Sequence, residues 1–255
     1  MKNYNKEIRN LIYKYGKDTR LALQENKKLP YLYALAELRE NVLDWYEFKP
    51  DSSLLQVGAD YGALTGLFLR RTGNVTVLDA SEESLQLVEQ RYRTEAGLKT
   101  VCGSLVSGKT LAADGYDYVT VIGTLCAETS LEEQLEAAKK ALRPGGVLFV
   151  AVCNTFGIKY FAGSERDAVT ASKKELQKLL PNGTFYYPVP DYRIASELYS
   201  DAYLPKKGDL TGVYTAYDYP QYTSMDTGAA YDAVCEDGQF DNFSNSFLVI
   251  WEKGV

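Results

Sequence analysis

SSLLQVGADYGALTGLFLRR, residues 52–71, is the stretch that decides the fold class. The apolar run 54–57 predicts a buried strand, the glycines after it predict a turn, and residues 63–71 predict a helix. NVTVLDAS (74–81) predicts a second strand that ends at Asp79, and Ser81 is a suitable N-cap for the next helix. Strand, glycine turn and helix form the first half of a βαβ unit.

The pattern continues along the chain. Further strands are expected near 100–101, in YDYVTVIGTL (116–125) and in GVLFVAV (146–152), alternating with helical stretches such as LEEQLEAAKKAL (131–142). Two last strands, TFYYPV (184–189) and SNSFLVIWEK (244–253), are expected to pair with each other. The alternation predicts an α/β, Rossmann-like, doubly wound fold, with a mostly parallel seven-stranded sheet and an antiparallel last strand.

Two segments lie outside this regular pattern. Residues 1–49 are expected to form an N-terminal helical segment that acts as a lid, with one amphipathic helix over 31–48 that stops before Pro50. Residues 50–255 form the main domain, which contains an insertion at 191–244. Between residues 186 and 231 lie ten of the chain's 21 tyrosines, so this region is expected to fold over the sheet edge rather than to be disordered.

Composition excludes several classes of chemistry. The chain has no histidine, which removes Ser-His-Asp and Cys-His catalysis and His-containing zinc sites. Its four cysteines form no CxxC pair, so we expect free thiols in a reducing cytosol and no metal. The polar start MKNYNKEIRN is unlike a signal peptide, and the apolar run VLFVAVC (147–153) is too short to span a membrane. With a net charge of −6, a cytoplasmic protein without a nucleic-acid partner is expected, and the oligomeric state stays open.

The glycine turn predicts an adenosine site. In a doubly wound sheet the ligand binds beyond the carboxyl ends of the strands, where a carboxylate after the second strand holds ribose hydroxyls. Gly58 and Gly62 would be the turn glycines, and Asp79 follows Gly58 by the expected 21 residues. A nicotinamide enzyme of the short-chain dehydrogenase type is a weaker alternative, because Asp60 would repel a pyrophosphate and Pro205 interrupts the YxxxK stretch at 203–207.

Four motifs in order resemble those of class I S-adenosylmethionine-dependent methyltransferases. They are LLQVGADYGALTG, VTVLDAS, YDYVTVIGTL and LRPGGVLFVAV, and they cover roughly residues 50–153. RENVLDWYEF, NTFGIKYFAG, YPVPDYR and SDAYLPKKGDL are similar more narrowly to bacterial methyltransferase domains associated with glycan and surface-polysaccharide biosynthesis.

The resemblance implies S-adenosylmethionine as cofactor and S-adenosylhomocysteine as product. It places the methionine end of the cofactor at the glycine turn, the ribose at Asp79, the adenine near Ser104 and the sulfonium above Gly123. Gln56 and Ser104 depart from the acidic residues that the family usually has there. Tyr31 and Tyr33 are either a lid over the cofactor or helix-packing residues. The cofactor-binding residues that we expect are Tyr31, Tyr33, Gln56, Gly58, Ala59, Asp60, Gly62, Asp79, Ala80, Ser81, Gly103, Ser104, Leu105, Ile122, Gly123, Thr124 and Leu125.

Methyl transfer from a sulfonium is an in-line displacement, which depends mainly on alignment and on exclusion of water. A hydroxyl nucleophile still benefits from a positioned base. The candidates are Glu128 after the fourth strand and Asn154, Lys159 and Tyr160 after the fifth, with a helix-start carboxylate and loop packing as their structural alternatives. Tyr187, Asp191 and Tyr192 are candidates for the acceptor pocket.

The sequence thus predicts a methyltransferase that methylates an oxygen of a saccharide or another small polar acceptor. The alternative from a different class is a non-catalytic module that binds an adenosyl cofactor. Gln56, Ser104 and the absence of a histidine base support that alternative.

Overall fold

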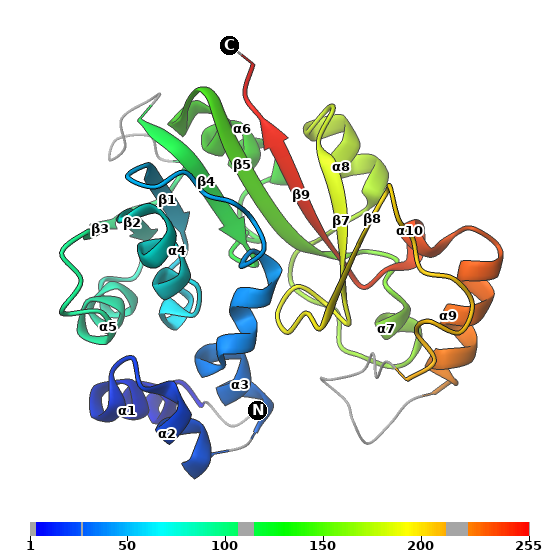
Figure 1. Cartoon of the computed structure of the whole chain (residues 1–255), viewed down its shortest axis with the longest axis horizontal. Helices are drawn as coiled ribbons and strands as arrows, with labels where there is room; N and C mark the ends of the chain where they lie inside the picture. The colour runs from blue at the N-terminus through cyan, green and yellow to red at the C-terminus, as the bar shows by residue number, and fades with distance from the viewer. Residues whose placement is uncertain (1–3, 27, 107–114, 213–223, 255) are drawn as a thin grey trace.

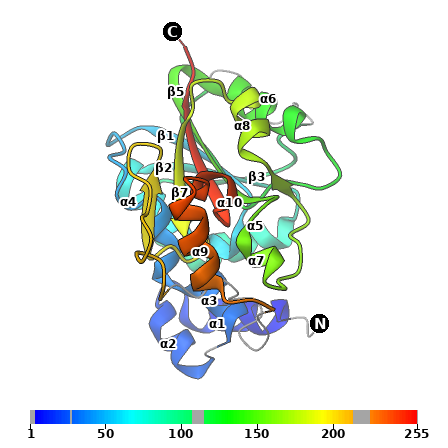
Figure 2. The same ribbon diagram turned by 90° about the vertical axis from the view of Figure 1, so that its right-hand side faces the viewer.

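The computed structural model describes residues 4–26, 28–106, 115–212 and 224–254. A twisted sheet crosses the molecule, helices cover both of its faces, and the N-terminal helices α1 to α3 lie together at one end (Figure 1). Helices α9 and α10 lie at the side of the molecule opposite α4 and β1 (Figure 1), and α9 is nearest the viewer in the view turned by 90° (Figure 2). No helix in the described ranges is both long and apolar enough to cross a membrane.

Within the described residues the strands form one sheet in the order β3-β2-β1-β4-β5-β9-β7-β8, and β6 pairs with β5. Strands β1 to β5 are parallel, whereas β9 is antiparallel to both β5 and β7. The mostly parallel order with an antiparallel β9 confirms the predicted fold, and β6 and β8 are additions to the seven predicted strands. The strands are β1 Ser53–Val57, β2 Asn74–Asp79, β3 Leu98–Cys102, β4 Tyr116–Ile122, β5 Leu142–Asn154, β6 Thr170–Ala171, β7 Thr184–Val189, β8 Glu197–Ser200 and β9 Ser246–Glu252.

The helices alternate with the strands as predicted, and serine side chains cap the N-termini of α5, α6 and α8. Ser81 accepts a hydrogen bond from the amide of Ser84, and Ser130 and Ser172 each form a capping box with a glutamate. The helices are α1 Asn5–Tyr15, α2 Thr19–Glu25, α3 Leu29–Leu35, α4 Thr65–Thr72, α5 Glu82–Arg91, α6 Leu131–Ala141, α7 Ile158–Phe161, α8 Lys173–Leu179, α9 Thr227–Glu236 and α10 Phe240–Phe243, with 3-10 turns η1 Glu37–Val42 and η2 Asp60–Gly62.

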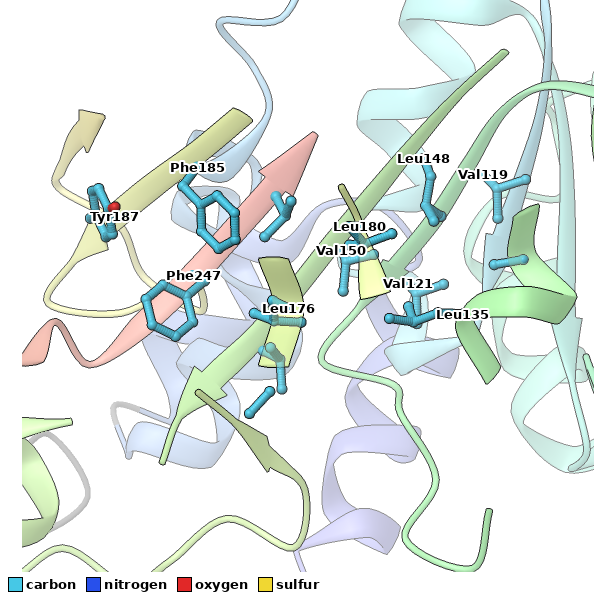
Figure 3. Packing of buried hydrophobic residues seen from close by; sticks show 14 of the residues in the cluster. Val119, Val121, Leu135, Leu148, Val150, Leu176, Leu180, Phe185, Tyr187 and Phe247 are labelled. Carbon is cyan, nitrogen blue, oxygen red and sulfur yellow. The ribbon is translucent and has the colours of Figure 1, made fainter. Parts of the chain in front are cut away.

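Alternate residues of the central strands fill two cores, one on each face of the sheet. On one face Val119, Val121, Leu148 and Val150 pack with side chains of α6 and α8 (Figure 3). On the other face side chains of α4 and α5 pack with Tyr118, Phe149 and other strand residues. The strands therefore read as continuous apolar runs, because both of their faces are buried.

The predicted single helix over 31–48 is wrong. Helix α3 ends at Leu35, Ala36 is extended with ψ 137°, and η1 begins at the next residue. Leu35 packs in the N-terminal cluster with Ile8 and Ile12, whereas Val42 packs against the sheet. One straight helix cannot bury both ends of this segment, so the chain bends between them.

The tyrosine-rich insertion both extends the sheet and packs on itself. Strand β8 pairs antiparallel with β7 and forms the edge of the sheet. Tyr187 and Tyr231 are fully buried and contact Phe240 of α10. Residues 213–223 of the predicted insertion lie outside the described residues.

Candidate functional site

The glycine turn after β1 is held by Gln56, which stands where the resembling family usually has an acidic residue. Gly58 and Gly62 have φ of 86° and 74°, a region that favours glycine. Gln56 is buried, accepts a hydrogen bond from Thr65 Oγ1 at 2.8 Å and donates one to the Gly58 carbonyl at 3.0 Å. An acid at position 56 could not make that second bond while ionised, so the glutamine fits this turn.

Asp79 stands at the carboxyl end of β2 and faces the glycine turn. Its Oδ2 accepts a hydrogen bond from the amide of Ala59 at 2.8 Å, and its Oδ1 accepts one from the amide of Ser81, also at 2.8 Å. A carboxylate offers about four acceptor positions. Two acceptor positions therefore remain for a ligand, and they fit the two hydroxyls of a ribose.

The other predicted cofactor residues follow the same edge of the sheet. Ala80, Ser81, Ser104 and Gly123 are exposed there, each just beyond a strand end. Gly103 donates its amide to the Asp79 carbonyl, which joins the ends of β2 and β3. Thr124 hydrogen-bonds the Val57 carbonyl at 2.6 Å, so its side chain joins the ends of β4 and β1. Leu105 and Leu125 are half-buried, and Ile122 is buried.

A Cβ on Gly58 would lie 2.3 Å from the Thr124 methyl group. The absence of a side chain at position 58 therefore makes room for Thr124 in this structure.

The N-terminal segment meets the site at separate points. Tyr31 is fully buried in the N-terminal cluster, where its hydroxyl donates to Glu7. Its placement is that of the helix-packing alternative. Tyr33 is half-buried, and the Arg193 guanidinium lies 5.3 Å from its ring centre, so it reaches the acceptor side. Arg39 of η1 is buried and forms an ion pair at 2.5 Å with Asp60 in the glycine turn.

A buried network of charged groups lies at the carboxyl end of β5. Lys159 Nζ donates to Asp167 Oδ2 at 2.9 Å and lies 3.3 Å from Cys153 Sγ. Tyr160 donates its hydroxyl to the same carboxylate oxygen at 2.6 Å. Arg193 donates to Asp167 Oδ1 at 2.5 Å and also contacts the Cys153 sulfur at 3.3 Å. The structure thus brings the predicted Lys159 and Tyr160 together on one carboxylate.

The electrostatics of this network keep Asp167 ionised. Burial opposes the charged form of Asp167, but Arg193 and Lys159 outweigh it and hold the pKa of that carboxyl well below its usual range. Burial raises the pKa of the Cys153 thiol to about 11 despite both cations. Burial opposes the charged form of Lys159 as well, yet the Cys153 sulfur and Asp191 leave its pKa raised. The site therefore presents a carboxylate anchored by two cations beside a neutral thiol.

Asn154 and Glu128, the other predicted catalytic candidates, have different surroundings. Asn154 is fully buried, and its amide nitrogen donates to the carbonyls of Asn242 and Ser244, both at 2.8 Å. Its oxygen accepts from the amide of Phe156 at 3.0 Å, so these three hydrogen bonds join loops. Glu128 is exposed after β4, where a hydrogen bond from the Cys126 thiol lowers its pKa.

A cavity of about 200 Å³ adjoins the network at the ends of β4 and β5. Tyr192 and Asp167 line it, together with Gly123 and Cys153. Tyr187, expected at the acceptor pocket, is instead buried in the core, where its hydroxyl donates to Asp201. Another cavity, of about 240 Å³, lies between α3, α4 and α5, and Arg91 and Arg70 are among its lining residues. It contains none of the expected site residues.

Sequence reasoning missed Asp167, Arg193, Cys153 and Arg39. Cys153 ends an apolar run, so its position at a strand end indicated a place in the site. We interpreted it only as a free thiol. Asp167 and Arg193 come from loops, and the periodicity of a sequence does not predict the path of a loop. Asp191, a predicted residue of the acceptor pocket, is buried beside Lys159, with Oδ2 3.8 Å from Nζ.

The fold is shared with solved structures of methyltransferases. A SAM-dependent methyltransferase from Thermotoga maritima superposes with a TM-score of 0.53 at 14% identity, over 97% of this chain and 100% of that chain. Geranyl diphosphate C-methyltransferase from Streptomyces coelicolor A3(2), in complex with S-adenosyl-L-homocysteine, gives a TM-score of 0.51 at 12% identity, over 87% and 78%.

The sequence comparisons agree with the fold. Residues 55–150 match a family described as a methyltransferase domain. The ubiquinone/menaquinone biosynthesis C-methyltransferase UbiE of Roseobacter denitrificans is 35% identical over 118 residues, 44% of this chain and 46% of that protein. The chain thus spans less than half the length of this curated relative. These matches support a methyltransferase domain that uses S-adenosylmethionine.

Proposed function

We propose that this chain is an S-adenosylmethionine-dependent methyltransferase that methylates a hydroxyl of a saccharide or another small polar acceptor. The observation that carries the proposal is the placement of Asp79, which keeps two acceptor positions beside the glycine turn. The cavity at the ends of β4 and β5 lies along the same sheet edge and offers a place for the acceptor.

The residues of the chain divide the work of binding. Asp79 would hold the ribose, the turn at Gly58 would hold the methionine end, and Gly123 would lie beneath the sulfur. When bound, S-adenosylmethionine supplies an electrophilic methyl group. The chain has to align an acceptor atom with that methyl group and exclude water, and the buried Tyr192 and Cys153 close the cavity on that side.

A small polar acceptor is supported by the polar groups of the cavity. The Asp167 side chain is 27% exposed and ionised, so it can accept a hydrogen bond from a hydroxyl or an amine. Lys159 and Arg193 balance Asp167 and Asp191, so the network carries no net charge to favour a polyanion. Stacking of sugars on the tyrosine-rich insertion has less support, because Tyr187 and Tyr231 are buried in its core.

Calorimetric titration with S-adenosylmethionine and S-adenosylhomocysteine, followed by transfer of a labelled methyl group to a glycan panel, tests the proposal. We expect binding of both ligands and transfer to at least one acceptor. Binding without transfer to any acceptor would favour the non-catalytic adenosyl-binding module. Failure to bind either ligand would refute both the enzyme and the module.

A second candidate function is methylation of a ring carbon of a quinol. It is favoured by the sequence match to UbiE, which its name describes as a C-methyltransferase of ubiquinone and menaquinone biosynthesis. A short-chain demethylated quinol added to the acceptor panel separates the two candidates, because the position of the label in the product shows whether carbon or oxygen was methylated.

A further inference from the structure

Two polar groups of opposite hydrogen-bonding character line the acceptor cavity. Asp167 can only accept hydrogen bonds, because it is ionised. Tyr192 lines the same cavity and can donate through its hydroxyl. The selectivity that this pair gives the cavity rests on the proposed methyltransferase function.

The Tyr192 hydroxyl is held in place but has no hydrogen-bond partner among the residues that the structure describes. The residue is 8% exposed, and its backbone amide donates to Ser246 Oγ at 3.0 Å. A Cβ on Gly123 would lie 2.5 Å from the hydroxyl oxygen, so the ring end rests directly on that glycine. Burial raises the pKa of Tyr192, which keeps the O–H proton in place at neutral pH. The hydroxyl oxygen is not among the buried unpartnered atoms of the described residues, so it keeps contact with solvent and can donate to a ligand in the cavity.

Asp167 has one acceptor position left. Its Oδ2 accepts from both Lys159 and Tyr160, and its Oδ1 accepts from Arg193. Two oxygens with about four positions therefore leave one on Oδ1. The two cations and the tyrosine fix the direction of the carboxylate, so a ligand meets it without reorganisation.

We propose that Tyr192 and Asp167 select an acceptor hydroxyl and orient it for attack on the methyl group. The oxygen of a hydroxyl has one hydrogen, which it donates to Asp167, and two lone pairs. One lone pair accepts the Tyr192 hydrogen bond, and the second remains for the reaction. A neutral amine has a single lone pair, which the Tyr192 bond would occupy, and a carbon nucleophile has no group that matches either partner.

The free lone pair of the acceptor oxygen forms the new O–CH₃ bond while the C–S bond of the sulfonium breaks, and the electron pair of that bond stays on sulfur. The hydroxyl proton passes to the Asp167 carboxylate and then to solvent. Although Asp167 is a weak base, the protonated ether formed by attack is a far stronger acid, so the transfer is downhill.

The test combines Tyr192→Phe and Asp167→Asn with the control Tyr203→Phe, whose side chain is 64% exposed and outside the cavity. Each variant is assayed for labelled methyl transfer to matched panels of sugars, phenols, amines and a quinol, and for S-adenosylhomocysteine binding by calorimetry. We expect transfer to hydroxyl oxygen only. Tyr192→Phe should lower kcat/KM by about 10-fold, and Asp167→Asn should lower it by about 100-fold or more. The affinity of both variants for S-adenosylhomocysteine should stay within about twofold of wild type.

Hydroxyl transfer that Tyr192→Phe leaves unchanged would overturn the assignment of this pair while the proposed function survives. Transfer to nitrogen or carbon as the main activity would overturn both the assignment and the proposed hydroxyl acceptor, and so would binding of S-adenosylhomocysteine with no hydroxyl acceptor in the sugar and phenol panels. Loss of S-adenosylhomocysteine binding by the wild-type chain would instead refute the proposed function itself. A urea denaturation curve for each variant separates unfolding from loss of the contact.

Discussion

Replacing Asp79 is the most direct test of where the cofactor binds. The carboxylate accepts two backbone hydrogen bonds, from Ala59 and Ser81, and has two acceptor positions left for ribose hydroxyls. Loss of the charge-assisted bonds to the ribose should weaken binding by about 1–3 kcal/mol, which is roughly 5- to 150-fold in Kd. Calorimetry with S-adenosylmethionine and S-adenosylhomocysteine measures this change.

Two replacements separate binding from folding. Asp79→Ala leaves the amide of Ala59, a fully buried residue, without its acceptor and should cost a further ~1–3 kcal/mol of stability in urea denaturation. Asp79→Asn keeps one oxygen for that amide, so it should lose affinity with a smaller loss of stability.

The matched control is Asp44→Asn, a carboxylate that is 54% exposed and pairs with Arg71. It should change neither the free energy of ligand binding nor the free energy of unfolding by more than about 0.5 kcal/mol. An Asp79→Asn protein that folds and binds both ligands with the wild-type Kd would refute the placement of the ribose.

Three further predictions concern single side chains. Gln56→Glu should destabilise the chain by about 1–3 kcal/mol in urea denaturation at pH 7, because an ionised glutamate cannot donate to the Gly58 carbonyl, whereas the exposed Gln86→Glu should have little effect. The hydrogen bond to Glu7 raises the pKa of Tyr31 from 10.0 to about 12. The contribution of this bond to the free energy of unfolding is therefore present below pH 10 and lost as the pH rises towards 12. Denaturation curves should show this loss in wild type and less of it in Tyr31→Phe. Iodoacetamide at pH 8 should modify the exposed Cys126 well before the buried Cys153, whose thiol has a pKa of about 11, and equal rates in peptide mapping would contradict the burial of β5.

The sheet was predictable from sequence because its strands are buried on both faces. Such strands read as short apolar runs, and the run that ends at Asp79 predicted both the end of β2 and the first site residue. Strand β8 was missed because its sequence ELYS carries no apolar run and it forms the sheet edge. The break at Ala36 was missed because the residues on either side keep helical spacing while they pack in different cores.

The site was predictable only where it lies at strand ends. Asp79 follows a strand, and Lys159 and Tyr160 follow β5 closely enough for the strand to place them near the edge. Asp167 and Arg193 are distant in sequence and meet only because two loops return to the same point. Their pairing depends on the tertiary path of those loops, which local spacing does not encode.

The three backbone bonds of Asn154 have a consequence for engineering this protein. This one side chain joins the segment that begins at Phe156 to the segment 242–244, which lies some 90 residues later. A loop graft intended to change acceptor preference must therefore transfer both segments together. A graft of either one alone would leave a buried amide facing a backbone that no longer fits it.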